Sequence, residues 1–151
     1  MSDGLTIRSA ESDDIPALFR LYAQLHPNDT LLTLAEAERI FERFCLYPGS
    51  SLFLGFLGDV PVTTCTLVVI PNLSRNGAPY ALIENVVTDG QFRNRGWGKT
   101  ILNEAISVAW RWNCYKVMLL TGAKDAATLN FYRSAGFENS KTGFQIRRHS
   151  P

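Results

Sequence analysis

One segment restricts the fold of this chain more than any other: residues 91–100, QFRNRGWGKT. It follows a largely apolar run at residues 80–88, which is typical of a buried central strand. It precedes apolar residues spaced three and four apart, which predict an amphipathic helix to about residue 112. Glycines let a backbone approach a ligand closely, and the free amides at a helix start attract anions. The sequence therefore predicts a strand, turn and helix unit whose turn can hold an anion.

Positive charge is concentrated at this turn. Arg93, Arg95 and Lys99 fall within ten residues that contain no Asp or Glu, whereas the whole chain has 15 Lys and Arg against 14 Asp and Glu, a formal charge of +1. Neither GxxxxGK[ST] nor a GxGxxG after the first strand is present, which argues against the common nucleotide motifs. The spacing R-x-x-G-x-G favours a polyanionic ligand, and a solvated basic turn is the alternative.

The other patterns predict further strands and helices around this unit. Strands are expected at residues 5–8, 51–57, 62–70, 116–121 and 137–147. Helices are expected to begin near Asp13, after a capping box at Thr33 and Glu36, and after Asp125, the last ending at Gly136. This order indicates an α/β or α+β sandwich with a mixed sheet and helices on both faces.

Composition excludes several classes of protein. A length of 151 residues with 46% hydrophobic and 19% charged residues fits one globular domain over residues 1–151. The near-neutral charge argues against nucleic-acid binding, and no apolar run is long enough to cross a bilayer or resembles a secretion signal, so we expect a cytoplasmic protein without membrane contact. The cysteines are too scattered for a disulfide framework or a zinc site, and no metal is expected: they are Cys45, Cys65 and Cys114.

Four features in this order give the chain a family resemblance. They are the strand at residues 83–87, the turn at residues 93–98, the strand end at residues 119–121 and the block NFYRSAGF at residues 130–137. Over roughly residues 4–147 the chain resembles the GNAT superfamily of acetyl-coenzyme A-dependent N-acetyltransferases. The resemblance implies a mixed, centrally splayed sheet of about six to seven strands.

The same resemblance implies where coenzyme A binds. The diphosphate would be held by amides around Arg95 to Lys99, supplemented by the Arg93 and Thr100 side chains. Backbone groups of Val86 and Thr88 would pair with the pantetheine arm, in the manner of an added strand. A bulge near Val86 and Val87 would aim an amide at the acetyl oxygen. The residues expected to bind the cofactor are Val86, Val87, Thr88, Arg93, Asn94, Arg95, Gly96, Trp97, Gly98, Lys99, Thr100, Asn130 and Arg133.

Two side chains are expected to carry the chemistry. Glu84 would accept a proton from the acceptor ammonium, directly or through water, if burial raises its proton affinity. Tyr132 would donate a proton to the departing thiolate. In the alternative interpretation, Glu84 pairs with a neighbouring cation and Tyr132 packs its helix against the sheet. The chain departs from the family pattern at Asp125, where many relatives have Asn, and at Trp97, which is bulkier than the usual residue.

The resemblance implies direct acetyl transfer in a ternary complex to a primary amine of a small molecule or peptide. The acceptor is expected to bind near the first two helices and the loop at residues 71–79. The alternative is a noncatalytic acyl-coenzyme A-binding or sensor domain. A homodimer is compatible with the resemblance.

Overall fold

Five strands form the sheet that positions the turn predicted to bind an anion. The computed structural model describes residues 4–149 and divides into two compact units, Met1–Leu119 and Leu120–Pro151. The strands of the first unit lie in the order of the chain: β1 (Leu5–Ser9), β2 (Ser51–Leu57), β3 (Val60–Ile70), β4 (Tyr80–Thr88) and β5 (Val117–Met118). Neighbours are antiparallel except β4 and β5, which are parallel. The predicted mixed sheet is therefore confirmed.

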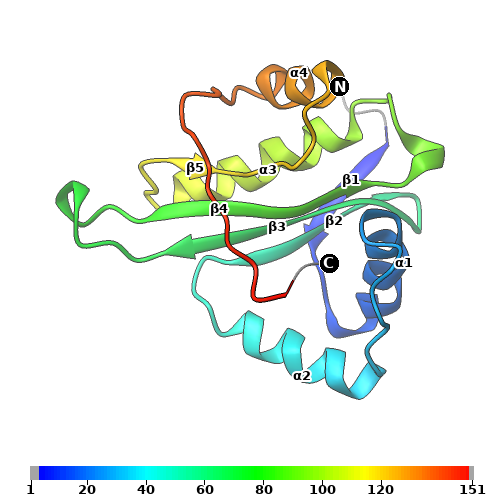
Figure 1. Cartoon of the computed structure of the whole chain (residues 1–151). Coiled ribbons are helices and arrows are strands. Elements are labelled where there is room, and N and C mark those ends of the chain that lie inside the picture. Colours follow the sequence, from blue (N-terminus) through cyan, green and yellow to red (C-terminus); the bar gives the residue numbers. More distant parts are fainter. Residues whose placement is uncertain (1–3, 150–151) are drawn as a thin grey trace. The chain divides into compact units, whose positions relative to one another are not determined.

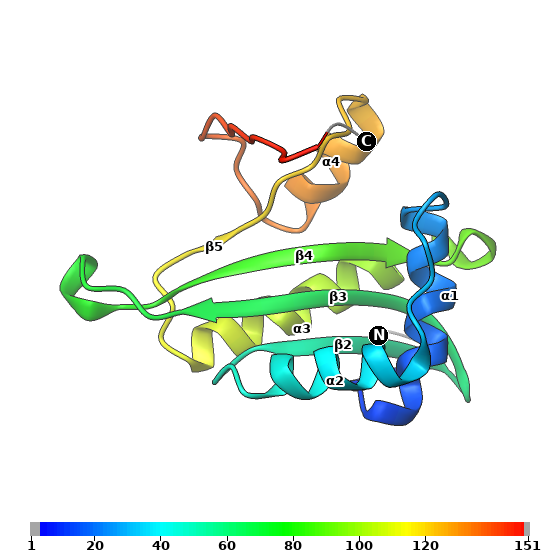
Figure 2. The same ribbon diagram turned by 60° about the horizontal axis from the view of Figure 1, so that its bottom comes forward.

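Helices cover both faces of this sheet. Helix α3 (Trp97–Arg111) lies on one face, while α1 (Ile15–Leu25) and α2 (Leu34–Cys45) lie on the other (Figures 1 and 2). Under α3, the buried Cys65 faces the Ile101 carbonyl. Under α1, Leu18 and Leu21 pack with Val87 in a second buried cluster. The predicted α/β sandwich, with helices on both faces, is confirmed.

The start of α2 follows from its capping box. The Thr33 hydroxyl accepts a hydrogen bond from the Glu36 N–H at 3.2 Å, and the Glu36 carboxylate accepts one from the Thr33 N–H at 2.9 Å. Two amides that lack helical partners are thereby satisfied. The helix ends at Cys45, shortly before Pro48, which cannot continue it.

Strand β4 contains the expected bulge, beginning at Asn85. Its register with β3 runs from Thr64 opposite Val87 to Thr66 opposite Glu84, so β4 holds one extra residue there. Asn85 adopts a left-handed conformation with φ 52°, which Asn tolerates better than most residues. Residues three apart in a regular strand point to opposite faces, but the bulge brings Glu84 and Val87 to the same face.

The second unit contains helix α4 (Ala126–Ser134). As predicted, Asp125 caps its start, accepting a hydrogen bond from the Thr128 N–H at 2.9 Å, and Gly136 follows its end with φ 97°. Three further short turns, η1 (Ser12–Asp14), η2 (Arg75–Gly77) and η3 (Gly90–Phe92), lie in the first unit. None of the helices within residues 4–149 has the length and hydropathy of a bilayer-spanning segment.

The strand predictions near the carboxyl end are partly wrong. Strand β5 spans only Val117–Met118 instead of residues 116–121, and residues 137–147 form no strand, so the described chain has five strands instead of six to seven. The alternation at residues 137–147 is weak, and the second unit offers no described strand as a hydrogen-bonding partner. Phe144 and Ile146 are 91% and 98% exposed, so no apolar burial fixes a pleat there.

Candidate functional site

The turn before α3 presents backbone amides without helical partners. Asn94 and Gly96 both have left-handed conformations, with φ 61° and 84°, and α3 begins at Trp97. The first intrahelical hydrogen bond runs from the Thr100 N–H to the Gly96 carbonyl, and no side chain caps the helix start. The amides of residues 97–99 precede that bond and thus remain available to a ligand at the positive end of the helix dipole.

Side chains add positive charge to this turn. The Arg93 Nε donates to the Thr88 carbonyl at 3.1 Å, and the Arg95 guanidinium lies 5.5 Å from the centre of the Phe92 ring. Both arginines and Lys99 are exposed. The Thr100 hydroxyl donates to the Gly96 carbonyl at 3.0 Å, which uses the proton expected for a phosphate but leaves its oxygen at the turn. Uncapped amides and exposed cations together fit a diphosphate.

Trp97 turns its indole away from solvent. The residue is half-buried, and its Nε1 atom is buried without a hydrogen-bond partner among residues 4–149. Its bulk is therefore accommodated within the protein at the first residue of α3.

Side chains of helix α1 bind the residues that connect β4 to the turn. The Arg20 guanidinium donates to the Asp89 carboxylate at 3.1 Å and to the Pro61 carbonyl, and the Gln24 side-chain oxygen accepts from the Gly90 N–H at 2.8 Å. Asp89 is buried and also accepts from the Gln91 N–H at 3.0 Å. These residues were not predicted, because Arg20 and Asp89 are 69 positions apart in the chain. The only local signal was the turn-forming Asp89–Gly90 pair.

We expect Asp89→Asn to reduce the free energy of unfolding by about 1–2 kcal/mol, because it weakens charge-assisted hydrogen bonds and a cap. It should also weaken coenzyme A binding, since the turn loses its anchor. Urea unfolding and calorimetric titration with coenzyme A measure the two effects. Glu104→Gln is the control, because the 3.4 Å pair of Glu104 with Arg111 is exposed and such pairs contribute little. Equal stability of the two variants would contradict this role of Asp89.

The sheet edge beside the turn has free backbone groups within the first unit. Strand β5 pairs only with Ala81 and Leu82 of β4, and no later β4 residue pairs with it. The Asp89 N–H donates to the Val62 carbonyl on the β3 side at 2.8 Å. Because backbone direction alternates along a strand, Val86 and Thr88 point toward the β5 side. The Thr88 carbonyl already accepts from the Arg93 Nε, so the backbone groups of Val86 and the Thr88 N–H are the ones placed for an extended ligand at this edge.

Glu84 lies on the opposite side of the sheet from α3. It is exposed, so the burial on which its predicted role as a base depends is absent. Its Cα partner on β3 is Thr66, which is buried. On α1, burial raises the pKa of Tyr22, and a hydrogen bond with the Thr66 side chain opposes part of that rise. Glu84 thus has a solvent-accessible carboxylate across the strand pair from the buried Thr66.

The remaining predicted site residues lie on α4 of the second unit. The Arg133 guanidinium donates to the Asn130 side-chain oxygen at 3.2 Å. Tyr132 contacts Phe131 and Phe137 edge to face, with ring centres 5.0 and 6.3 Å apart. Hydrogen bonds from Thr128 hold the pKa of Asp125 below its ordinary value, so this residue caps the helix as an acceptor. The structure thus places the predicted residues in two groups, residues 84–100 and residues 130–133.

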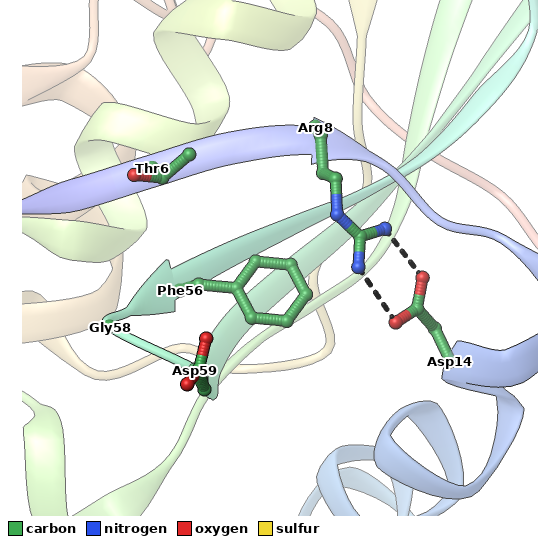
Figure 3. A pocket seen from close by; sticks show the side chains of 6 residues that line it. All are labelled: Thr6, Arg8, Asp14, Phe56, Gly58 and Asp59. Carbon is green, nitrogen blue, oxygen red and sulfur yellow. Dashed lines mark hydrogen bonds and ion pairs between the residues drawn. The ribbon is translucent and has the colours of Figure 1, made fainter.

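A hollow of about 370 Å³ lies at the β1 edge of the sheet, lined by Thr6, Arg8, Asp14, Phe56, Gly58 and Asp59 (Figure 3). Arg8 spans it, with hydrogen bonds of 2.6 and 3.0 Å to Asp14 and its guanidinium 4.5 Å from the centre of the Phe56 ring. Arg8 and Asp14 neutralise each other's charge, so a structural role explains their presence in the hollow. Within residues 4–149, no group of three or more His, Cys, Asp and Glu side chains is arranged to hold a metal ion.

The ion pair in this hollow predicts a pH-dependent contribution to stability. The hydrogen bond from Arg8 holds the pKa of Asp14 below its ordinary value of 3.8. A lowered carboxylate pKa stabilises the fold above the unfolded value, and this stability is lost as the pH falls through the folded value. We expect Asp14→Asn to be less stable than the wild type at pH 7, with a difference that shrinks below about pH 3.8. Urea unfolding of both proteins at pH 7 and below about pH 3.8 tests this expectation. A stability difference that is the same at both pH values would contradict it.

Comparisons with known proteins agree with this geometry. The acetyltransferase (GNAT) family matches residues 15–137. A solved structure named "Putative acetyltransferase from Agrobacterium tumefaciens str. C58" is 48% identical, superposes with a TM-score of 0.90, and is covered over 95% of this chain and 99% of that one. The family resemblance and the fold predicted from it are thus confirmed.

Two further relatives carry a named substrate. Glucosamine 6-phosphate N-acetyltransferase of Trypanosoma brucei brucei is 33% identical over 76 residues, which are 50% of this chain and 50% of that relative. The match therefore spans about half the length of this curated relative. The glucosamine-6-phosphate N-acetyltransferase of Arabidopsis thaliana shares the fold with a TM-score of 0.86 at 23% identity, covering 96% of this chain and 99% of that one.

Proposed function

Because the chain belongs to the acetyltransferase (GNAT) family, we propose that it transfers an acetyl group from acetyl-coenzyme A to a primary amine of a small molecule or peptide. The uncapped start of α3 carries this proposal. Its free amides, the left-handed Gly96 and the exposed Arg93, Arg95 and Lys99 fit the diphosphate of coenzyme A. We further propose a cytoplasmic location, a single functional domain over residues 1–151 and a possible homodimer.

Acetyl-coenzyme A supplies the acetyl thioester in this reaction. Val86 and Thr88 present backbone groups at the edge of β4 where strand pairing with β5 ends, and they would hold the extended arm. The bulge at Asn85 changes the direction of the backbone at Val86 and Val87, where an amide N–H would stabilise charge on the carbonyl oxygen. Asn130 and Arg133 on α4 complete the proposed binding residues.

Two protons must move during acetyl transfer to an ammonium. The acceptor has to lose one before its nitrogen can attack, and Glu84 is the exposed carboxylate proposed to take it, directly or through water. The departing sulfur gains one, which the Tyr132 hydroxyl is proposed to donate, and the second proton that the nitrogen loses after attack restores that hydroxyl. A thiol has a pKa near 8.5 and a phenol near 10, so this transfer is only slightly uphill.

The acceptor is proposed to be a primary amine. The names of the relatives favour amino sugars, since proteins of Trypanosoma brucei brucei and Arabidopsis thaliana are glucosamine 6-phosphate N-acetyltransferases. An exposed carboxylate on the face covered by α1 suits any ammonium group. The structure of the site therefore supports the class of acceptor, and the particular amine requires a screen.

Release of free thiol from acetyl-coenzyme A tests the proposal. The panel comprises glucosamine 6-phosphate, an aminoglycoside, a polyamine, simple primary amines and a peptide with a free amino terminus. We expect at least one amine to accelerate thiol release, with the acetylated amine as product. Tight binding of coenzyme A without release on any amine would instead support the noncatalytic sensor domain. Absence of binding at low salt would overturn both functions.

Tyr132→Phe is expected to lower kcat by about tenfold while leaving the Kd for coenzyme A unchanged. The effect is below the usual range of about 100-fold to 10,000-fold for acid catalysis, because a thiolate of pKa near 8.5 leaves without full protonation. Phenylalanine retains the ring contacts of Tyr132 with Phe131 and Phe137, so folding should be preserved. Steady-state kinetics from pH 6 to 10 measure the change. A wild-type rate at every pH would show that the hydroxyl is not the donor.

A further inference from the structure

A buried carboxylate lies directly before the turn proposed to bind the diphosphate. Asp89 follows the last residue of β4, and its side chain is only 8% exposed. A buried charge destabilises a protein unless an opposite charge or hydrogen bonds compensate it. A negative charge at this position would also repel phosphate groups. Asp89 therefore has to be neutralised before the turn can bind a diphosphate well.

Arg20 of α1 supplies the opposite charge. Helix α1 lies beside the end of β4 (Figure 2), and the Arg20 Nη1 atom donates to the Asp89 Oδ2 atom at 3.1 Å. The Arg20 Nη2 atom donates to the Pro61 carbonyl, so the guanidinium bridges two segments of the first unit. The Asp89 Oδ1 atom accepts from the Gln91 N–H at 3.0 Å. Both carboxylate oxygens therefore have partners, and the ion pair has no net charge.

Gln24 extends this contact by one turn of α1. Residues four apart lie on one face of a helix, and the Gln24 side-chain oxygen accepts from the Gly90 N–H at 2.8 Å. The Phe92 N–H donates to the Asp89 carbonyl at 2.8 Å. All three N–H groups of η3 therefore have acceptors within the protein, whereas those of residues 97–99 have no helical partner. Of these two sets, only the second is open to a diphosphate.

Arg93 is the residue most affected by the charge of Asp89. The Arg93 Nε atom donates to the carbonyl of Thr88, the residue before Asp89, at 3.1 Å. Arg93 is exposed, and its two terminal nitrogens have no hydrogen-bond partner among residues 4–149. It is also the cation closest to Asp89 along the chain. Without Arg20, a charge-assisted hydrogen bond from Arg93 to Asp89 would compete with a phosphate for this guanidinium.

We propose that Arg20 is a positioning residue for coenzyme A, which it affects through Asp89 without contacting the cofactor. By neutralising the buried carboxylate, Arg20 leaves Arg93 and the amides of residues 97–99 free to bind the diphosphate. This inference rests on the proposed function, because it concerns the same cofactor site. Helix α1, which lies on the face of the sheet that carries Glu84, thereby determines part of the affinity for the cofactor.

Calorimetric titration with coenzyme A at low salt tests this role. Arg20→Gln should raise the Kd about tenfold, because it leaves a negative charge beside the phosphates. Adding Asp89→Asn to this variant removes that charge, so the double variant should bind within about threefold of the wild type. A structural role without electrostatics predicts the opposite order, in which the double variant, having lost both partners, binds most weakly.

Arg111→Gln is the matched control. It removes the same charge and leaves Glu104 without its partner, but it lies at the last residue of α3, about 20 Å from the start of that helix. Its Kd for coenzyme A should equal that of the wild type. A loss of about tenfold in this variant as well would overturn the inference, because the total charge of the protein would then determine the affinity.

Ionic strength gives a second readout. At about 1 M salt the Debye length is about 3 Å, so the difference in Kd between Arg20→Gln and the wild type should shrink to about twofold. Arg20→Lys keeps the charge but loses the forked geometry, and it should bind within about threefold of the wild type. This variant and the double variant keep the test decisive if Arg20→Gln does not fold.

A wild-type Kd in Arg20→Gln, an equal loss in the double variant, or a loss of about tenfold in Arg20→Lys would overturn the inference while coenzyme A binding by the wild type stands. An effect of Arg20→Gln that persists undiminished at about 1 M salt would do the same. Absence of coenzyme A binding by the wild type would instead refute the proposed function.

Discussion

Glu84→Gln is expected to lower kcat/KM for the amine acceptor about 100-fold at neutral pH, the lower end of the range for a general base. When the acceptor is an alkyl ammonium, its pKa is near 10, so almost none of it is free amine at pH 7. Glutamine keeps the size of the side chain but cannot take the proton. The remaining rate should rise with pH toward about 10, because the acceptor then loses its proton to water.

The pH profile separates this role from a structural one. Glu84 is exposed, so the substitution should leave the Tm close to that of the wild type. Glu104→Gln, at another glutamate of the first unit with a partly exposed side chain, serves as control and should keep the wild-type profile. If Glu84→Gln retains both the rate and the profile, the proton goes directly to solvent or to another group.

Gly96→Ala is expected to raise the Kd for coenzyme A by about 30-fold, which corresponds to about 2 kcal/mol. Gly96 has φ 84°, a conformation that strains an alanine. Apart from its chain neighbours and the backbone of its own helix, no atom of residues 4–149 lies within 4 Å of an added Cβ, so the methyl group would project into free space at the turn. The backbone would shift, or the methyl group would occupy the space proposed for the diphosphate. Calorimetric titration with coenzyme A measures the loss.

Gly58→Ala separates the two causes of that effect. Gly58 also has a left-handed conformation, with φ 59° and open space around an added Cβ, but it lies in the turn between β2 and β3. Both variants should lose similar stability from backbone strain, whereas only Gly96→Ala should lose affinity for coenzyme A. Equal Kd values in the two variants would overturn the assignment of the diphosphate site.

Local signals predicted the parts of the fold that depend on neighbouring residues. The capping box at Thr33, the cap at Asp125 and the turn at Gly96 each involve groups a few positions apart, and all three form as expected. Asn85 could also have indicated where the bulge lies. An asparagine within an apolar strand is uncommon, and here it adopts the left-handed conformation of the bulge.

Contacts between distant segments could not be predicted from local patterns. The ion pair of Arg20 with Asp89 requires that α1 lie beside the end of β4, and no spacing in the sequence specifies this contact. The Thr66 and Tyr22 pair is of the same kind. At residues 137–147 the reverse error occurred, because alternation suggests a strand but does not provide the neighbour with which a strand must pair.

The extra residue in β4 has a consequence for how this strand tolerates change in length. Deleting Asn85 would leave a regular ladder with β3, in which Glu84 and Val87 stand two positions apart and so keep the face that they share now. Val87 would stay in the layer beneath α1, and only the bulge and the redirected backbone at Val86 would be lost. A one-residue gap at this position in a sequence alignment would therefore mark the loss of the bulge, while the same side chains remain buried.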